Sequence, residues 1–122
     1  MSHVVQVRNI QCKDEQALIQ ACSHLGLSCK EGTHQLFGSQ KATGLAVNLP
    51  GWRYPVVIDT KTGEAKYDNY NGSWGKQDEL DKLIQRYAIE AAKNEGALHG
   101  FQSVEHELEN GDVRLEMVSY AP

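Results

Sequence analysis

The sequence has no long apolar run, and this absence argues against a chain organised around a membrane-spanning helix. No stretch of the 122 residues approaches the roughly 20 consecutive apolar residues that cross a bilayer. The opening residues 1–4 also lack the basic-then-apolar pattern of a secretory signal. We therefore expect a soluble protein that stays in the cytoplasm and makes no membrane contact.

Clusters of basic residues are also missing. The 12 Lys and Arg are outnumbered by 16 Asp and Glu, and no window holds three adjacent bases. Because duplex nucleic acid is bound through a concentrated basic footprint, we expect no duplex as a partner. The charge is uneven along the chain. Residues 1–58 carry five bases and three acids (+2), whereas residues 59–122 carry seven bases and thirteen acids (−6).

Cysteines are few, and their odd number argues against a closed disulfide framework. The three are Cys12, Cys22 and Cys29. Cys22 and Cys29, with His24 and His34, place four potential zinc ligands within thirteen residues, but the spacing is not that of paired C-x-x-C knuckles. We expect structural thiols, no metal and no cofactor, with a zinc site as the minor alternative.

The common catalytic motifs are absent as well. The chain has no G-x-S-x-G elbow, no phosphate-binding G-x-x-x-x-G-K-[ST] loop, no H-E-x-x-H and no G-x-G-x-x-G. This absence favours a binding protein and leaves the question of an enzymatic activity open.

What is present is a series of short strand signals and two helix signals. A strand is predicted at residues 3–8, and a helix then begins at the N-cap Asp14 and ends at Gly26. Its apolar face holds Ala17, Leu18, Ala21, Cys22 and Leu25. Strands are predicted at 34–38, 45–49, 54–59 and 64–68, and the 3.6-residue period of 76–95 predicts a long helix that Gly96 ends.

A hairpin closes the chain around Asn110-Gly111, the strongest short-range hairpin signal. A two-residue loop would pair Leu108 with Val113 and His106 with Leu115. Because side chains alternate between faces, this register predicts one apolar face and one charged face. The apolar face would hold Val104, His106, Leu108, Val113, Leu115 and Met117.

These elements predict one α+β domain over residues 1–122, in the order β-α-β-meander-α-β-β. Strands and helices do not alternate regularly, which disfavours a doubly wound parallel sheet. An antiparallel sheet with two helices packed on one face is the simplest two-layer arrangement.

The candidate functional segment is residues 67–75, which joins a strand to the long helix and is rich in aromatic and amide side chains. Such a loop can stack on a planar ligand or form a protein-binding hot spot. The predicted binding residues are Trp52, Tyr54, Tyr67, Asp68, Tyr70 and Trp74. A structural interpretation stands beside this one: Asn71-Gly72 forms a turn, Ser73 caps the helix and Trp74 packs its start. We expect Asp68 and Tyr70 to be functional, and Gly72 and Trp74 to be structural.

His106 is the second candidate. It lies on the predicted apolar face, where an imidazole must be hydrogen-bonded or lose its charge. It is either a satisfied core or edge histidine or a polar group of a site.

Several segments together resemble a known family. They are the opening residues 1–3 followed by a strand and an Asp-Glu-led helix, residues 68–75 running into 80–88, and the closing hairpin 109–115. They resemble the hypothetical chloroplast reading frame 35 family, a domain of unknown function in cyanobacteria, algal plastids, other bacteria and phages. The resemblance covers nearly the whole chain, and residues 85–88 and Trp74-Gly75 are its most specific elements. It implies no catalytic residue, an accessory role beside an AAA-class ATPase, and the plastid stroma if a plastid encodes the chain.

Two main hypotheses follow. The first is a small cytosolic binding or adaptor protein without catalysis, which contacts a protein partner, or a second copy of itself, through residues 67–74 with Trp52 and Tyr54. The alternative is a small-ligand or nucleotide-derivative binding protein, conceivably an enzyme, that uses Asp68, Tyr70 and His106. A lesser hypothesis is single-stranded nucleic-acid stacking on Trp52, with Arg53 and Lys41.

Overall fold

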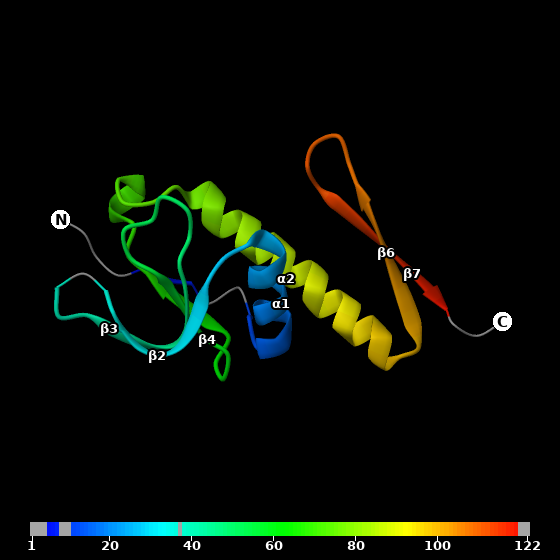
Figure 1. The fold of residues 1–122 in the computed structure, drawn as a ribbon, viewed down its shortest axis with the longest axis horizontal. Helices are drawn as coiled ribbons and strands as arrows, with labels where there is room; N and C mark the ends of the chain where they lie inside the picture. The colour runs from blue at the N-terminus through cyan, green and yellow to red at the C-terminus, as the bar shows by residue number, and fades with distance from the viewer. Residues whose placement is uncertain (1–4, 8–10, 37, 120–122) are drawn as a thin grey trace.

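The computed structural model describes residues 5–7, 11–36 and 38–119. The elements follow in the order β1 (Val5–Val7), α1 (Glu15–Leu25), β2 (Cys29–Gln35), β3 (Lys41–Val47), β4 (Val56–Asp59), β5 (Glu64–Tyr67), a 3-10 turn (Tyr70–Gly72), α2 (Gln77–Leu98), β6 (Phe101–Glu107) and β7 (Val113–Ser119) (Figure 1). Every strand pair in these residues is antiparallel. The predicted α+β class and element order are confirmed.

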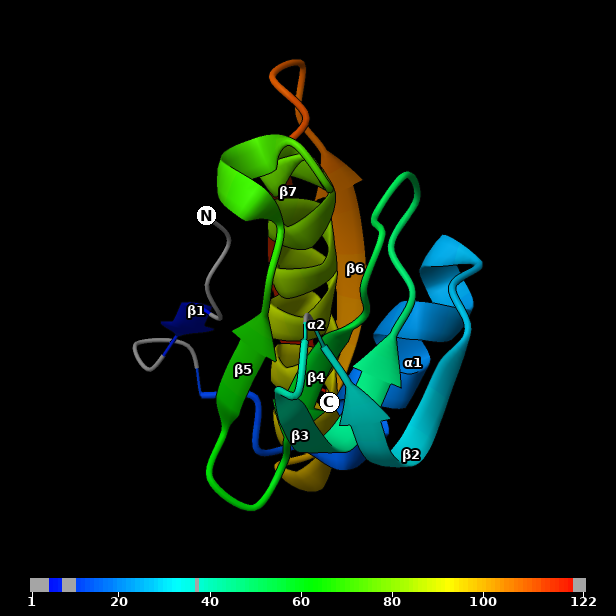
Figure 2. The ribbon, with the colours of Figure 1, turned by 90° about the vertical axis from the view of Figure 1, so that its left-hand side faces the viewer.

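Five strands form one sheet, in the order β1-β5-β4-β3-β2, and both helices cover the same face of it (Figure 2). The main core is built where the helices meet this face. Leu18 of α1 and Leu83 of α2 are completely buried against Val47, Val56 and Ile58 of the sheet. The predicted packing of two helices on one face is therefore confirmed.

The other face of the sheet is covered locally. A second cluster of Leu36, Ala42, Ala46 and Val57 lies there, with Tyr54 packed against it. Strands β3 and β4 are thus buried on both faces where they pair, which is why their sequences lack clean alternation.

Two strands begin at least four residues earlier than predicted. The strand expected at 34–38 is β2, which begins at Cys29 and ends at Gln35; Phe37 lies outside the described residues. Its sequence, CKEGTHQ, is polar because β2 is an edge strand, so its position depends on pairing with β3 more than on burial. The strand expected at 45–49 is β3, which begins at Lys41 and ends at Val47.

The first helix matches the prediction at both ends. The Asp14 side chain accepts a hydrogen bond of 3.0 Å from the Ala17 N–H, and Gly26 takes the left-handed conformation with φ 70°. The Tyr87 hydroxyl accepts a 3.0 Å bond from the Asp14 N–H, so the start of α1 is attached to α2. Leu25 departs from the predicted apolar face, since 36% of it is exposed.

The second helix continues past its predicted end. Gly96 is buried within α2, which ends at Leu98, and Gly100 is the left-handed residue that follows. A Cβ on Gly96 would lie 2.8 Å from the Met117 sulfur. Gly96 therefore permits close packing of β7 on the helix and does not end it. No helix among the described residues combines the length and apolarity needed to cross a bilayer.

The last two strands form a separate two-stranded sheet packed on the C-terminal half of α2 (Figure 1). The predicted register is wrong by one residue. Leu108 N–H donates to Asp112 O at 2.8 Å, and Gly111 has φ 87°, so the loop has three residues and a bulge instead of two. His106 consequently lies opposite Arg114, and Glu105 lies opposite Leu115.

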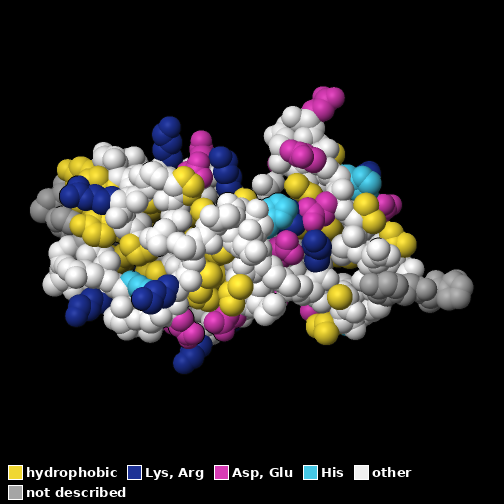
Figure 3. All heavy atoms as spheres, in the orientation of Figure 1, with side chains coloured by type: hydrophobic (Ala, Val, Ile, Leu, Met, Phe, Trp, Pro, Cys, Tyr) yellow, Lys and Arg dark blue, Asp and Glu magenta, His cyan; other side chains and the backbone are white. Residues whose placement is uncertain are grey.

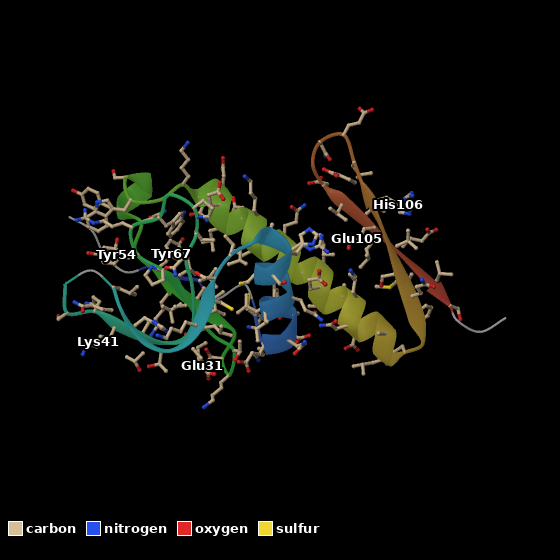
Figure 4. All side chains as sticks on the ribbon, in the orientation of Figure 1. Glu31, Lys41, Tyr54, Tyr67, Glu105 and His106 are labelled. Carbon is tan, nitrogen blue, oxygen red and sulfur yellow. The ribbon has the colours of Figure 1, made fainter. Side chains whose placement is uncertain are left out.

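This shift exchanges the two faces of β6 and leaves Val113, Leu115 and Met117 of β7 on the side that faces α2. Glu105, expected on the wet side, points toward α2, whereas His106 lies on the other side of the hairpin, as Figure 4 shows. Val104 and Leu108, expected in the core, are 39% and 44% exposed.

Glu105 connects the hairpin to α2 through Arg86, a guanidinium that is only 7% exposed. Its two outer nitrogens bind the two oxygens of Glu105 at 2.7 and 2.8 Å, and one also binds Glu90 at 2.8 Å. Lys93 adds a contact of 3.0 Å to Glu105. The hydrogen bonds from Arg86, followed by those from Lys93, lower the pKa of Glu105 to about 2 despite its partial burial.

The first prediction uses two glycines that lie opposite each other in β2 and β3. Gly32 and Gly44 have nearly the same backbone angle, φ 145° and 151°. A Cβ on Gly44 would overlap the Ile58 carbonyl of β4, whereas a Cβ on Gly32 would meet only His34 at 3.7 Å. Gly44→Ala should therefore lower the free energy of unfolding by about 2 kcal/mol more than Gly32→Ala. Urea denaturation measures both, and equal losses would contradict this packing.

The second prediction concerns acid stability. Because the Glu105 pKa is lowered from 4.5 to about 2, its stabilising contribution is complete above pH 4.5 and is lost as the pH falls toward 2. Glu105→Gln should flatten the fall in unfolding free energy across this window, measured by urea titration at successive pH values. Glu107→Gln, two residues along the same strand, is the control and should follow the wild-type slope.

Candidate functional site

Two loop segments, residues 49–54 and 68–76, lie side by side at the end of the five-stranded sheet. Arg53 N–H donates to Trp74 O at 2.8 Å, and the Trp52 indole N–H donates to Lys76 O at 3.0 Å. Asn69 is buried and donates to Gly75 O at 3.3 Å. These bonds hold the aromatic residues of both segments in fixed positions.

Three of the six predicted binding residues support the fold beneath this surface. Tyr67 is 6% exposed and packs edge-on against Trp52, with ring centroids 5.5 Å apart. Asp68 is 1% exposed, and one of its oxygens accepts a 3.1 Å bond from the Tyr70 N–H. Its other oxygen has no hydrogen-bond partner within the described ranges. Gly75 has no space for a Cβ because the Trp52 ring lies against it.

The other three predicted residues form a surface together with Arg53. Tyr70 stacks on Trp74 with ring centroids 4.8 Å apart and planes 22° apart. Tyr54 meets Trp74 edge-on at 5.6 Å, and the Arg53 guanidinium lies 5.0 Å from the Trp74 ring. We call Arg53, Tyr54, Tyr70 and Trp74 the aromatic surface.

Tyr70 is held in an unusual backbone conformation. Its φ of 48° is the one positive value among the described non-glycine residues. The Asp68 bond to its N–H and the Ser73 N–H bond to its carbonyl, at 3.0 Å, support this conformation. The ring remains 36% exposed. A strained residue that presents an aromatic side chain to solvent is a feature of binding sites.

Trp74, expected to be structural, is the ring that Arg53, Tyr54 and Tyr70 all contact, which agrees with a structural role as well as with a binding one. One expectation for this loop is wrong. Ser73 does not cap the following helix: the N-cap of α2 is Lys76, whose side chain makes no capping bond. Arg53 was not among the predicted binding residues and was considered only as a contact for single-stranded nucleic acid. Its position between Trp52 and Tyr54 in the sequence is the signal that could have identified it as part of the site.

On the face drawn in Figure 3, charged side chains are distributed unevenly between the two ends of the molecule. In Figure 3 the end that carries this loop shows basic and apolar side chains, whereas acidic ones gather over the hairpin end. Tyr54 and Tyr67 lie at the first end in Figure 4, with Lys41 toward the same side. The uneven charge of the sequence is therefore also uneven in space.

The alternative set of Asp68, Tyr70 and His106 does not form one site. Tyr67, which precedes Asp68, lies at the opposite end of the molecule from His106 in Figure 4. His106 hydrogen-bonds with Glu116 at 3.1 Å on the hairpin. Asp59 and Asp68 are also apart, because Asp59 pairs with Glu64 at the far end of β5, roughly 13 Å along the strand.

Away from this loop, a groove of about 400 Å³ lies between the end of α1, α2 and the hairpin. Its charged lining includes Lys82, Arg86 and Glu105. Arg86 and Glu105 are already paired with each other, and none of the predicted binding residues lines the groove.

Within the described part of the chain, no three His, Cys, Asp or Glu residues lie close enough to hold a metal ion. Cys12 and Cys22 are buried in the main core, and Cys29 packs against it.

Comparison with protein-family models, with curated proteins and with solved structures finds no match for this chain. The site is therefore interpreted from its geometry.

The third prediction concerns the thiols. Burial raises the pKa of Cys12 to about 11, and burial together with the neighbouring Cys29 thiol raises that of Cys22 to about 12. Since the thiolate is the reactive form, native protein should react with Ellman's reagent at half-buried Cys29 first and at the other two only on unfolding. Cys29→Ser should remove the early phase. Equal rates at all three thiols would contradict the prediction.

Proposed function

We propose that the chain is a small binding or adaptor protein of the cytoplasm, without catalysis of its own, that contacts a protein partner through the aromatic surface. The observation that carries this proposal is the Tyr70–Trp74 stack, exposed at Tyr70 and flanked by Arg53 and Tyr54. Tyr, Trp and Arg are the residues that dominate binding energy at protein interfaces.

Preorganisation supports the proposal. The surface is fixed by backbone bonds between the two segments and by the packing of Trp52 beneath it, so binding would order few side chains. Tyr and Trp also offer a large contact area at low conformational-entropy cost.

The chemistry of the surface indicates the partner. Rings at the centre favour an apolar segment, and Arg53 at the rim favours acidic groups around it. The resemblance in the sequence implies an AAA-class ATPase as one such partner. A small ligand is less well supported, because Asp68 is buried and His106 lies at the other end of the molecule.

The fourth prediction tests this surface by affinity capture from lysate, followed by calorimetry with the purified partner. Tyr70→Ala and Arg53→Ala should each weaken binding by at least roughly tenfold, because truncating an interface anchor commonly removes more than 1.4 kcal/mol.

Ile19→Ala is the matched control. Ile19 is 41% exposed, close to the 36% of Tyr70, but lies on α1. The Ile19→Ala variant should bind the partner with wild-type affinity. Equal affinity for the wild type and both aromatic-surface variants would exclude this surface as the contact.

A further inference from the structure

The C-terminal hairpin carries an unusual share of exposed apolar surface for a two-stranded sheet. Among the described residues, most of the exposed large apolar side chains belong to the hairpin or to the end of α2: Leu98, Phe101, Val104, Leu108, Met117 and Val118. Figure 3 shows apolar side chains on the hairpin between acidic groups and a histidine. Two strands alone rarely make a stable sheet, and open strand edges are templates for further pairing.

Of the two strands, β6 makes most of the hairpin's contacts with α2, so β7 has the more accessible edge. Hydrogen-bonded and non-hydrogen-bonded pairs alternate along an antiparallel ladder. The Leu108–Asp112 pair is hydrogen-bonded at 2.8 Å, so the N–H and C=O groups of Val113, Leu115 and Met117 point away from β6. The β7 edge thus offers three residues in position to pair with another strand.

The side chains of β7 suit a second copy of the same strand. If β7 pairs antiparallel with itself around Leu115, then Val113 lies opposite Met117 and Arg114 lies opposite Glu116, each contact occurring twice. The apolar pairs would lie on the α2 side, where Met117 is 38% exposed and Val113 and Leu115 are half-buried.

The positions of the charged side chains favour pairing of β7 with itself around Leu115 over pairing around Glu116 or through β6. Pairing around Glu116 instead would place the two Glu116 carboxylates opposite each other, which is unfavourable. Strand β6 carries acids and no Lys or Arg, so it has no comparable self-complementarity. On β7, Glu116 contacts His106 at 3.1 Å, and Arg114 has no ion pair within the described ranges.

We propose that two copies of the chain associate through the β7 edges, forming a continuous four-stranded sheet, β6-β7-β7-β6, in which Arg114 of each copy pairs with Glu116 of the other. The contact is independent of the aromatic surface, which lies at the opposite end of the molecule (Figure 4).

The fifth prediction tests the pairing by charge reversal. Sedimentation equilibrium of the wild type should show a concentration-dependent species of twice the 13.6 kDa chain mass. Arg114→Glu alone and Glu116→Arg alone should each raise the dissociation constant about tenfold, since like charges then face each other twice. An equimolar mixture of the two variants should recover wild-type affinity, because acids on one chain then face bases on the other. This recovery also shows that both variants fold.

Three controls complete the experiment. Glu109→Arg changes the same charge in the hairpin loop and should leave the association unchanged. Tyr70→Ala should also leave it unchanged, which separates this proposal from the partner contact proposed above. Any of three results overturns the proposal. The wild type stays monomeric, the mixture of variants does not recover wild-type affinity, or the dimer is unaffected by both charge reversals, as expected of a dimer that exchanges hairpins.

Discussion

The ion pair between the buried Arg86 guanidinium and the partly exposed Glu105 carboxylate is the interaction on which the position of the C-terminal hairpin depends. The hairpin has few apolar contacts of its own, so its position on α2 is fixed by this bidentate pair together with the packing of Met117 at Gly96. The pair also selects the strand register. A slip by one residue would turn His106 toward the helix in place of Glu105 and leave the Arg86 guanidinium with one carboxylate fewer. The Arg86–Glu105 pair therefore contributes more to the choice of strand register than to the free energy of unfolding.

The turn of α2 that carries Arg86 also holds the start of the first helix. Arg86 binds the hairpin, and the Tyr87 hydroxyl accepts the N–H of Asp14 at the start of α1. One turn of α2 therefore binds both the hairpin and the start of α1.

The sequence predicted those features that depend on local signals. The first helix was found because the Asp14 cap, the apolar period and Gly26 all lie within fourteen residues. Strand β2 was misplaced because an edge strand is defined by its neighbour. The predicted register of the hairpin is wrong by one residue because Asn110-Gly111 fits both a two-residue turn and the bulged three-residue turn that forms. Gly96 was taken for a helix end because its contact, Met117, is distant in sequence.

The candidate site was predicted in composition but not in arrangement. Six aromatic or acidic residues were selected, and the fold buries Tyr67 and Asp68, places Trp52 under the loop and leaves Tyr54, Tyr70 and Trp74 as the surface. Which of these side chains are buried depends on how the loops 49–54 and 68–76 meet in space. Arg53 joins the site because its N–H donates to Trp74 O of the other loop.

The length of α2 has a mechanical consequence. Its 22 residues make a continuous rod of roughly 33 Å, with the aromatic loop before its first turn and the hairpin after its last. The rod fixes the distance between the two ends whatever each end contacts. Because the hairpin folds back along α2, a contact on β7 and a contact on the aromatic loop would be held at a fixed separation shorter than the helix itself.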